Sequence, residues 1–347
     1  MKTIQGVHEI IEHYDTFIVD QWGVLHDGTR PYDGVLHTIA QLRAAHKQLV
    51  VLSNSSRRIN MSMTSLTKMG FAPQDDFAHV VTSGEVACAV LQSPSMRMLK
   101  DWPPPPLTNA AATMTSKKAI VLGSGGDDDA AYLQDCGGWT LTTNVDEASL
   151  ILTRGPYIIH CNDDSVLDCR QDPVAYQTAL DALLQAAARR QLPMLVTNPD
   201  KKSPKGENMP GLIGDAYEKL LLSHTLVAQS SDATTPIPTS RPLVKRIGKP
   251  FPEVYDWALQ KCGVTTTDKS RVCMVGDSLE TDVAGAAAAG IAAVWVLRDG
   301  VHQTQVEGRP LSEGAQQVLE SFNQNSKHSY AKGKILHPDY VVEHFTW

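Results

Sequence analysis

The feature that most constrains the fold of this chain is a series of short, unbroken apolar runs, each followed by small or polar residues. The runs are FIVD (17–20), LVVLSN (49–54), AIVLGS (119–124), LILTR (150–154), MLVTNPD (194–200), VCMVGDS (272–278) and AAVWVL (292–297). Strands that are buried on both faces of a parallel sheet have this pattern, whereas strands with one solvent face alternate. The runs therefore predict a parallel sheet with both faces covered.

The segments between these runs have helical periodicity. Val35, Ile39 and Leu42 recur at helical spacing and would share one face of a helix, and residues 172–190 form a longer example. Alternating strands and helices are typical of the α/β class. We therefore predict a Rossmann-like, doubly wound core.

Two segments interrupt this alternation. Residues 92–118 are rich in proline and include WPPPPL (102–107), and residues 229–242 form a polar linker. A chain of 347 residues, 42% of them apolar, is also long enough for two domains. We predict a core of residues 1–84 and 246–347, with an α/β cap domain of residues 85–245 inserted into it.

Composition argues against several classes of partner. The net charge is -7 and no long run of Lys or Arg occurs, which disfavours binding to nucleic acid or to an anionic membrane surface. The apolar runs are too short to span a bilayer, and the first 15 residues contain no signal-type apolar block. The six cysteines show no C-x-x-C spacing, so we expect reduced, structural thiols and a cytoplasmic protein.

Candidate site residues lie just beyond the predicted strands. In doubly wound sheets, ligands bind outside the carboxyl ends of the strands. The polar residues that follow the first, second and sixth runs therefore belong to one candidate site, together with a lysine that precedes a predicted helix. These residues are Asp20, Ser53, Asn54, Lys249, Asp277 and Asp282.

This set of residue types suits phosphoryl transfer. Asp20 offers a carboxylate nucleophile, which would divide hydrolysis into the formation and the breakdown of an acyl phosphate. Three converging carboxylates would raise one another's pKa, and a hard cation such as Mg²⁺ relieves that repulsion. Lys249 and the Ser53 hydroxyl would hold phosphate oxygens.

Most of these residues also have a purely structural interpretation. Asp20, Asp277, Ser53 and Asn54 could cap turns or helices. Asp282 could be a first-turn carboxylate that interacts with a helix dipole. The glycine-rich stretch LGSGGDDDA (122–130) lacks the full dinucleotide-binding pattern, so we interpret it as a turn within the cap.

Four motifs in order resemble those of the haloacid dehalogenase superfamily of phosphohydrolases. They are DQWGVL, LSN, GKPFPEVY and VGDSLETD. The long segment between the second and third motifs is similar to the branch with a large α/β cap there, which includes p-nitrophenylphosphatase-like, nucleotide and sugar-phosphate phosphatases. VTNPD (196–200) also resembles a cap signature of that branch.

The resemblance implies a role for each matching residue. It makes Asp20 the nucleophile, Ser53 and Lys249 the phosphate-holding residues, Asp277 a magnesium ligand, and Asp282 a ligand or a carboxylate just behind the ligands.

Trp22 departs from the usual pattern of that superfamily. Most members have an aspartate two residues after the nucleophile, whose carbonyl binds Mg²⁺ and whose side chain protonates the leaving group. Trp22 keeps the carbonyl but lacks the acid, and positioned acid–base groups contribute roughly 10²–10⁴-fold to rate. D-x-W-G-V-x-H-D-G resembles one subgroup of the branch, in which His26 or Asp27 could carry the proton instead.

We therefore predict a Mg²⁺-dependent phosphatase that acts on a small phosphorylated metabolite and favours good leaving groups. The alternatives are a phosphate-binding or regulatory protein with impaired catalysis, and transfer of phosphate to an acceptor other than water. The cap would close over the substrate and could offer a surface for a homodimer. Within the cap, the residues predicted to contact the substrate are Arg154, Asn198, Asp200 and Lys201.

Overall fold

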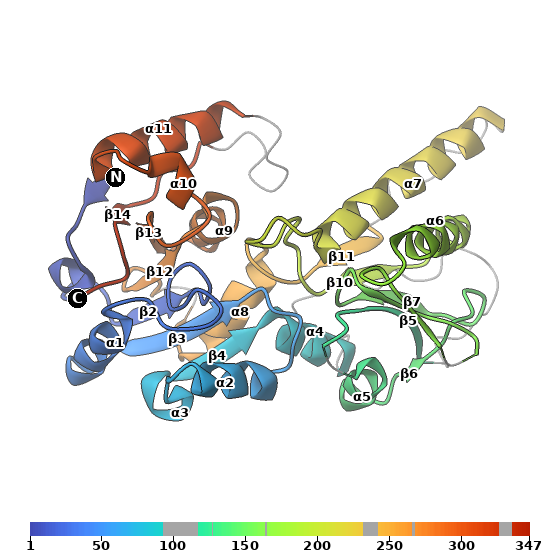
Figure 1. Cartoon of the computed structure of the whole chain (residues 1–347), viewed down its shortest axis with the longest axis horizontal. Coiled ribbons are helices and arrows are strands. Elements are labelled where there is room, and N and C mark those ends of the chain that lie inside the picture. The colour runs from blue at the N-terminus through green and yellow to red at the C-terminus, as the bar shows by residue number, and fades with distance from the viewer. Residues whose placement is uncertain (93–116, 127, 164, 232–241, 266–267, 326–334) are drawn as a thin grey trace. The chain divides into compact units, whose positions relative to one another are not determined.

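The computed structural model of the chain describes residues 1–92, 117–126, 128–163, 165–231, 242–265, 268–325 and 335–347. Most of the proline-rich segment 92–118 and of the polar linker 229–242 lies outside these residues. The chain divides into two compact units (Figure 1). The first unit contains Met1–Ser53, Arg58–Thr82 and Gly248–Trp347, and the second contains Asn54–Arg57 and Ser83–Ile247.

A seven-stranded parallel sheet forms the centre of the first unit, in the order β1-β14-β13-β12-β2-β3-β4. Its strands are β1 (Lys2–Thr3), β2 (Thr16–Val19), β3 (Gln48–Ser53), β4 (His79–Thr82), β12 (Val272–Gly276), β13 (Ala292–Val296) and β14 (Tyr340–Val342). The helical elements are a 3-10 turn (Val7–Ile10), α1 (Val35–Ala44), α2 (Ile59–Lys68), α3 (Pro73–Asp76), α8 (Pro252–Lys261), a π-helical turn (Leu279–Val283), α9 (Ala284–Ala289), α10 (Gln303–Val306) and α11 (Leu311–Gln324).

Both faces of this sheet are covered, as the unbroken apolar runs predicted. Phe17 and Val19 of β2 belong to one apolar cluster with residues of α1 such as Ile39. Ile18, between them in sequence, is equally buried but lies outside that cluster. Successive side chains of a strand point to opposite faces, so β2 has an apolar environment on each side.

The second unit is built on its own sheet, in the order β11-β10-β7-β5-β8-β9, with β6 paired to β5. The strands are β5 (Lys118–Gly123), β6 (Thr140–Leu141), β7 (Leu150–Thr153), β8 (Ile158–His160), β9 (Val166–Asp168), β10 (Met194–Val196) and β11 (Val244–Arg246). The helices are α4 (Ser83–Gln92), α5 (Asp129–Asp135), α6 (Pro173–Arg189) and α7 (Pro210–Ser231). An apolar cluster on one face of the sheet includes Tyr176, Leu180 and Leu184 of α6 and Tyr217 of α7.

The predicted α/β class is confirmed, and each predicted apolar run contains a strand. Most of the strands that the sequence did not reveal have two or three residues, such as β1 and β14, although the four-residue β4 was also missed. β8 and β9 also run antiparallel to their neighbours, whereas parallel pairing was expected. Runs of two or three residues are too short for periodicity to identify them.

The expectation that all cysteines are reduced is wrong for one pair. Cys88 in α4 and Cys136 at the end of α5 form a disulfide, although 48 residues separate them in sequence. The other four cysteines are free thiols. Helix packing within the second unit brings the two sulfur atoms together, and no short spacing motif could reveal this.

No helix among the described residues is both long enough and apolar enough to cross a membrane.

Candidate active site

The candidate site lies where three adjacent strands of the first unit end. Asp20 follows β2, Asp277 follows β12, and Ser53 is the last residue of β3. The strands are in register, because Val19 is paired with both Val51 and Val275, and the Asp20 N–H donates to the Val275 carbonyl at 2.9 Å. The carboxyl edge of the parallel sheet therefore gathers these residues, as expected for a doubly wound fold.

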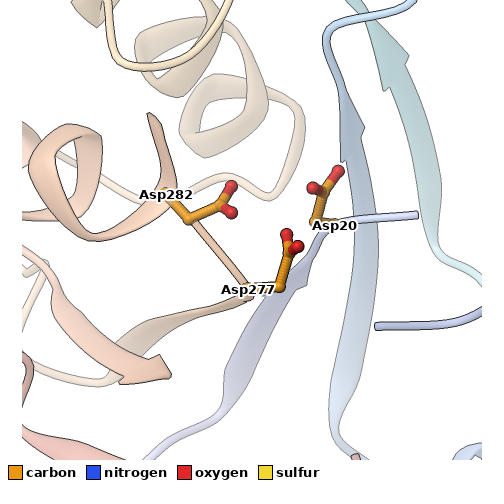
Figure 2. Close-up of side chains that lie close together, drawn as sticks. All are labelled: Asp20, Asp277 and Asp282. Carbon is orange, nitrogen blue, oxygen red and sulfur yellow. The ribbon is translucent and has the colours of Figure 1, made fainter. Parts of the chain in front are cut away.

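Three carboxylates converge at this edge. Asp20, Asp277 and Asp282 each present one oxygen such that the three atoms lie within 4.8 Å of one another. Figure 2 shows the three side chains pointing toward a common region from β2, from the end of β12 and from the turn after it. The structure thus brings together the three aspartates that the sequence analysis predicted to hold a metal.

Lys249 supplies a buried positive charge to this group. Its Nζ lies 2.6 Å from Asp20 Oδ1 and 2.7 Å from Asp282 Oδ1, and its side chain is 2% exposed. Burial alone would lower the pKa of Lys249, but the two carboxylates outweigh that effect and raise it above its ordinary value. Lys249 is therefore a permanent cation that links Asp20 to Asp282.

Asp277 and Asp282, which follow β12, are buried close together, so their negative charges repel each other. Burial, followed by the charges of Asp282 and Asp20, raises the pKa of Asp277 well above its usual range. Burial also raises the pKa of Asp282 to about 6, although Lys249 opposes the rise. If all three carboxylates were ionised, one lysine would leave an excess of negative charge in a low-dielectric site.

Close backbone approach around these carboxylates depends on glycine. Gly23 has a φ of +80°, and a Cβ there would lie 2.4 Å from Asp277 Oδ2. A Cβ on Gly276 would lie 2.2 Å from the Cβ of Asp282. The Gly in DQWGVL and the Gly in VGDSLETD therefore leave space for the two acidic side chains.

The loop after β2 orients the Asp20 carboxylate. The Gln21 backbone N–H donates to Asp20 Oδ1 at 2.7 Å, while the Gln21 side-chain amide donates to Ser62 Oγ of α2 at 2.9 Å. The Trp22 indole N–H donates to the Asp27 carbonyl at 3.2 Å. The indole is thereby held by its own loop and carries no group that can protonate a leaving group.

The two residues suggested as substitute proton carriers are engaged in loop structure. His26 is buried, its Nδ1 accepts from the Gly28 N–H, and burial lowers its pKa to about 4 despite the charge of Asp27. The Asp27 carboxylate accepts from the hydroxyl and N–H of Thr29 and from the Arg30 N–H, which lowers its pKa. Both side chains therefore stabilise the turn at 26–30.

Asn54, predicted to bind phosphate, belongs by its contacts to the second unit. Its side-chain amide donates to Asp200 Oδ1 at 2.8 Å. Asp200 in turn donates its N–H to the side-chain carbonyl of buried Asn198. Three predicted residues thus form one hydrogen-bonded chain within the second unit.

The two predicted cap cations are engaged in ion pairs. Lys201 Nζ lies 2.9 Å from Asp215. Arg154 is buried, pairs with Asp129 at 2.5 Å and stacks over the Tyr132 ring at 3.8 Å from its centroid. Arg154 therefore contributes to the packing of the second unit. The substrate contacts predicted for Arg154, Asn198, Asp200 and Lys201 stay predictions.

Two contacts of Asp277 were not foreseen from the sequence. The Val301 N–H donates to Asp277 Oδ2 at 2.8 Å, and the Trp295 indole N–H donates to the Asp277 carbonyl at 2.9 Å. A backbone donor leaves no signature in side-chain identity. Trp295 lies in the apolar run of β13, where it looked like an ordinary core residue.

The donor set fits a hard divalent cation such as Mg²⁺. Such ions prefer oxygen ligands and are usually held by only a few carboxylates. A cation would also offset the burial and the carboxylate repulsion that together raise the pKa of Asp277, effects that the Val301 N–H and the charge of Lys249 oppose. Asp20, Asp277 and Asp282 are the side chains that would hold it.

Comparisons with known protein families agree with this site. A model of haloacid dehalogenase-like hydrolases matches residues 17–138, and a HAD-hydrolase-like model matches residues 246–325. The first match contains Asp20 and Ser53, and the second contains Lys249, Asp277 and Asp282. A pyrimidine 5'-nucleotidase of Escherichia coli is 40% identical over 62 residues, which is 26% of its own length.

Solved structures match over nearly the whole chain. A haloacid dehalogenase-like hydrolase from Brucella suis has a TM-score of 0.62 at 20% identity, and 98% of each chain is covered. A possible sugar phosphatase from Cytophaga hutchinsonii has a TM-score of 0.63 at 15% identity, with 100% and 99% covered. A 4-nitrophenylphosphatase from Thermotoga maritima has a TM-score of 0.58 at 21% identity, and the match covers 97% of this chain and 96% of that one. These likenesses establish the fold and, with the family matches, confirm the resemblance found in the motifs.

Proposed function

Because the chain belongs to the haloacid dehalogenase-like hydrolases, we propose that it is a phosphatase that hydrolyses a small phosphorylated metabolite through an aspartyl phosphate on Asp20. The observation that carries this proposal is the constellation of the partly buried Asp20 with the buried residues Lys249, Asp277 and Asp282. The names of the similar structures support it, since they include phosphatases.

The chemistry follows from the geometry of Asp20. Its carboxylate lies at the open end of β2, oriented by the Gln21 N–H and paired with Lys249. A carboxylate oxygen attacks phosphorus, the bond from phosphorus to the leaving-group oxygen breaks, and an acyl phosphate forms. Water then attacks the same phosphorus, which releases inorganic phosphate and restores the carboxylate.

Lys249 and Ser53 hold the transferring group in this mechanism. The ammonium of Lys249 sits 2.6 Å from the nucleophile, so it can follow the charge of the phosphoryl oxygens as it develops. Ser53 is 9% exposed at the end of the neighbouring strand, and its hydroxyl can donate to one of those oxygens. Mg²⁺ on the three aspartates would supply further charge neutralisation at the phosphate.

Trp22 sets the range of leaving groups. Without an acid at this position, the leaving oxygen departs unprotonated, so aryl and acyl phosphates should react far faster than alkyl phosphates. His26 and Asp27 do not replace the acid in this proposal, because their side chains are engaged in the turn at 26–30.

A steady-state assay tests the proposal. p-Nitrophenyl phosphate, acetyl phosphate and an alkyl phosphate are compared with and without Mg²⁺, beside Asp20→Asn. Mg²⁺-dependent turnover of the two activated substrates, abolished in Asp20→Asn, is expected. Trp22→Asp should extend turnover to the alkyl ester by roughly 10²–10⁴-fold.

The second candidate is a phosphate-ligand binding or regulatory protein, and Trp22 is the observation that favours it. No turnover of any substrate, combined with measurable binding of inorganic phosphate and no activity in Trp22→Asp, would replace the phosphatase by this candidate.

A further inference from the structure

The turn that carries Asp282 has an unusual backbone. It is a π-helical turn, Leu279–Val283, in which the Val283 N–H donates to the Ser278 carbonyl at 3.1 Å, five residues back. Turns of this kind are rare and frequently mark functional sites. Here the wide turn places Asp282 beside Lys249 and leaves Asp282 Oδ2 to accept from the Ser278 N–H at 3.0 Å.

Tyr255 of α8 braces this turn from outside. Its hydroxyl lies 3.3 Å from the carbonyl of Thr281 and 3.3 Å from the carbonyl of Asp282, so one proton is shared between two consecutive carbonyls. The ring is completely buried. Burial, and after it the charges of Asp282 and Asp20, raises the pKa of Tyr255 well above its ordinary value, so the hydroxyl keeps its proton.

Gly285 makes this contact possible. A Cβ at position 285 would lie 2.3 Å from the Tyr255 hydroxyl and 2.5 Å from the ring carbon that bears it. The first turn of α9 therefore lacks a side chain where the tyrosine ring packs. The Tyr255 ring, Gly285 and the π-helical turn that carries Asp282 therefore pack closely against one another.

We infer that Tyr255 is a positioning residue for the metal site, because it holds the π-helical turn that aims the Asp282 carboxylate at the cation. This inference rests on the proposed Mg²⁺ site. Tyr255 has no part in the chemistry and acts only through Asp282. Mutating a residue that orients a metal ligand typically lowers metal affinity by 10- to 100-fold. Because the hydrogen bond of Tyr255 is long and shared between two carbonyls, we expect a loss near the lower value, about 10-fold.

The test compares Mg²⁺ binding in four proteins by isothermal titration with MgCl₂, supported by the rise of Tm with MgCl₂ concentration. They are the wild type, Tyr255→Phe, Asp277→Asn as a ligand-deficient reference, and Tyr217→Phe as a matched control. Tyr217 is also fully buried, and its hydroxyl donates to the Leu192 carbonyl at 2.8 Å in the second unit. Each Tyr→Phe variant loses a buried hydrogen bond, but only the Tyr255 hydroxyl is bonded to the turn that carries Asp282.

The inference predicts that the Kd for Mg²⁺ is about 10-fold larger in Tyr255→Phe and unchanged in Tyr217→Phe. The Mg²⁺ concentration for half-maximal turnover should rise by the same factor, while kcat at saturating Mg²⁺ stays near the wild-type value. Gly285→Ala, which pushes against the hydroxyl, should weaken Mg²⁺ binding in the same direction.

Two results would overturn the inference, and they differ from each other. If the wild type binds Mg²⁺ and Tyr255→Phe binds it equally well, the tyrosine is only a core residue and the proposed phosphatase stands. If the wild type itself binds no Mg²⁺, both the proposed metal site and the role of Tyr255 fail.

Discussion

Replacing Lys249 by methionine is the perturbation with the largest expected effect on both stability and activity. The ammonium lies 2.6 Å from Asp20 and 2.7 Å from Asp282 and is 2% exposed. Removing one partner of a buried ion pair costs about 3–5 kcal/mol, since the remaining charges stay buried and uncompensated. Lys118→Met is the matched control, because Lys118 pairs with Glu147 at 2.6 Å with both side chains more than 40% exposed; this variant should lose less than about 1 kcal/mol.

The assay for Lys249→Met is urea unfolding, extrapolated to water, at pH 7.5 and pH 5.5 without Mg²⁺. The folded-state pKa of Asp282 is raised to about 6, so the folded state binds this proton more tightly than the unfolded chain and gains stability as the pH falls. Lys249 opposes that rise, so without it Asp282 should be protonated at pH 5.5. The loss of unfolding free energy in Lys249→Met, relative to the wild type, should therefore be smaller at pH 5.5 than at pH 7.5. Phosphatase turnover should fall about 10²–10³-fold. A deficit no larger than that of Lys118→Met, or one independent of pH, would refute the reasoning.

Two further predictions concern the loop after β2. Burial lowers the pKa of His26 from 6.5 to about 4, so the free energy of unfolding should be unaffected by His26 above pH 6.5 and should fall by about 3 kcal/mol as the pH drops to 4. His26→Gln should remove this acid dependence in unfolding experiments, whereas replacing the exposed His37 should leave it in place. Gly23→Ala should cost more stability than Gly70→Ala and weaken Mg²⁺ binding, because both glycines have positive φ but only Gly23 faces Asp277. Equal losses in the two glycine variants would show that backbone strain alone matters.

Sequence alone determined the α/β class and the main strands of both units. An apolar run of four to six residues that is followed by small or polar residues has few uses other than a strand buried on both faces. The residues directly after those strands then had to share one edge of the sheet. Asp20 and Asp277 were predictable for this reason, and the four ordered motifs supported Lys249 and Asp282 as members of the same site.

Tertiary structure decided what depends on contacts between distant segments. The disulfide between Cys88 and Cys136 requires α4 and α5 to pack together. The burial of Arg154 depends on its ion pair with Asp129 in another element of the second unit. The hydrogen bonds from the Tyr255 hydroxyl to the Thr281 and Asp282 carbonyls join α8 to the π-helical turn that precedes α9. Local patterns report which face of an element is apolar, but they do not report which element will cover it. The charged site was therefore readable in the sequence, and the packing that aims it was not.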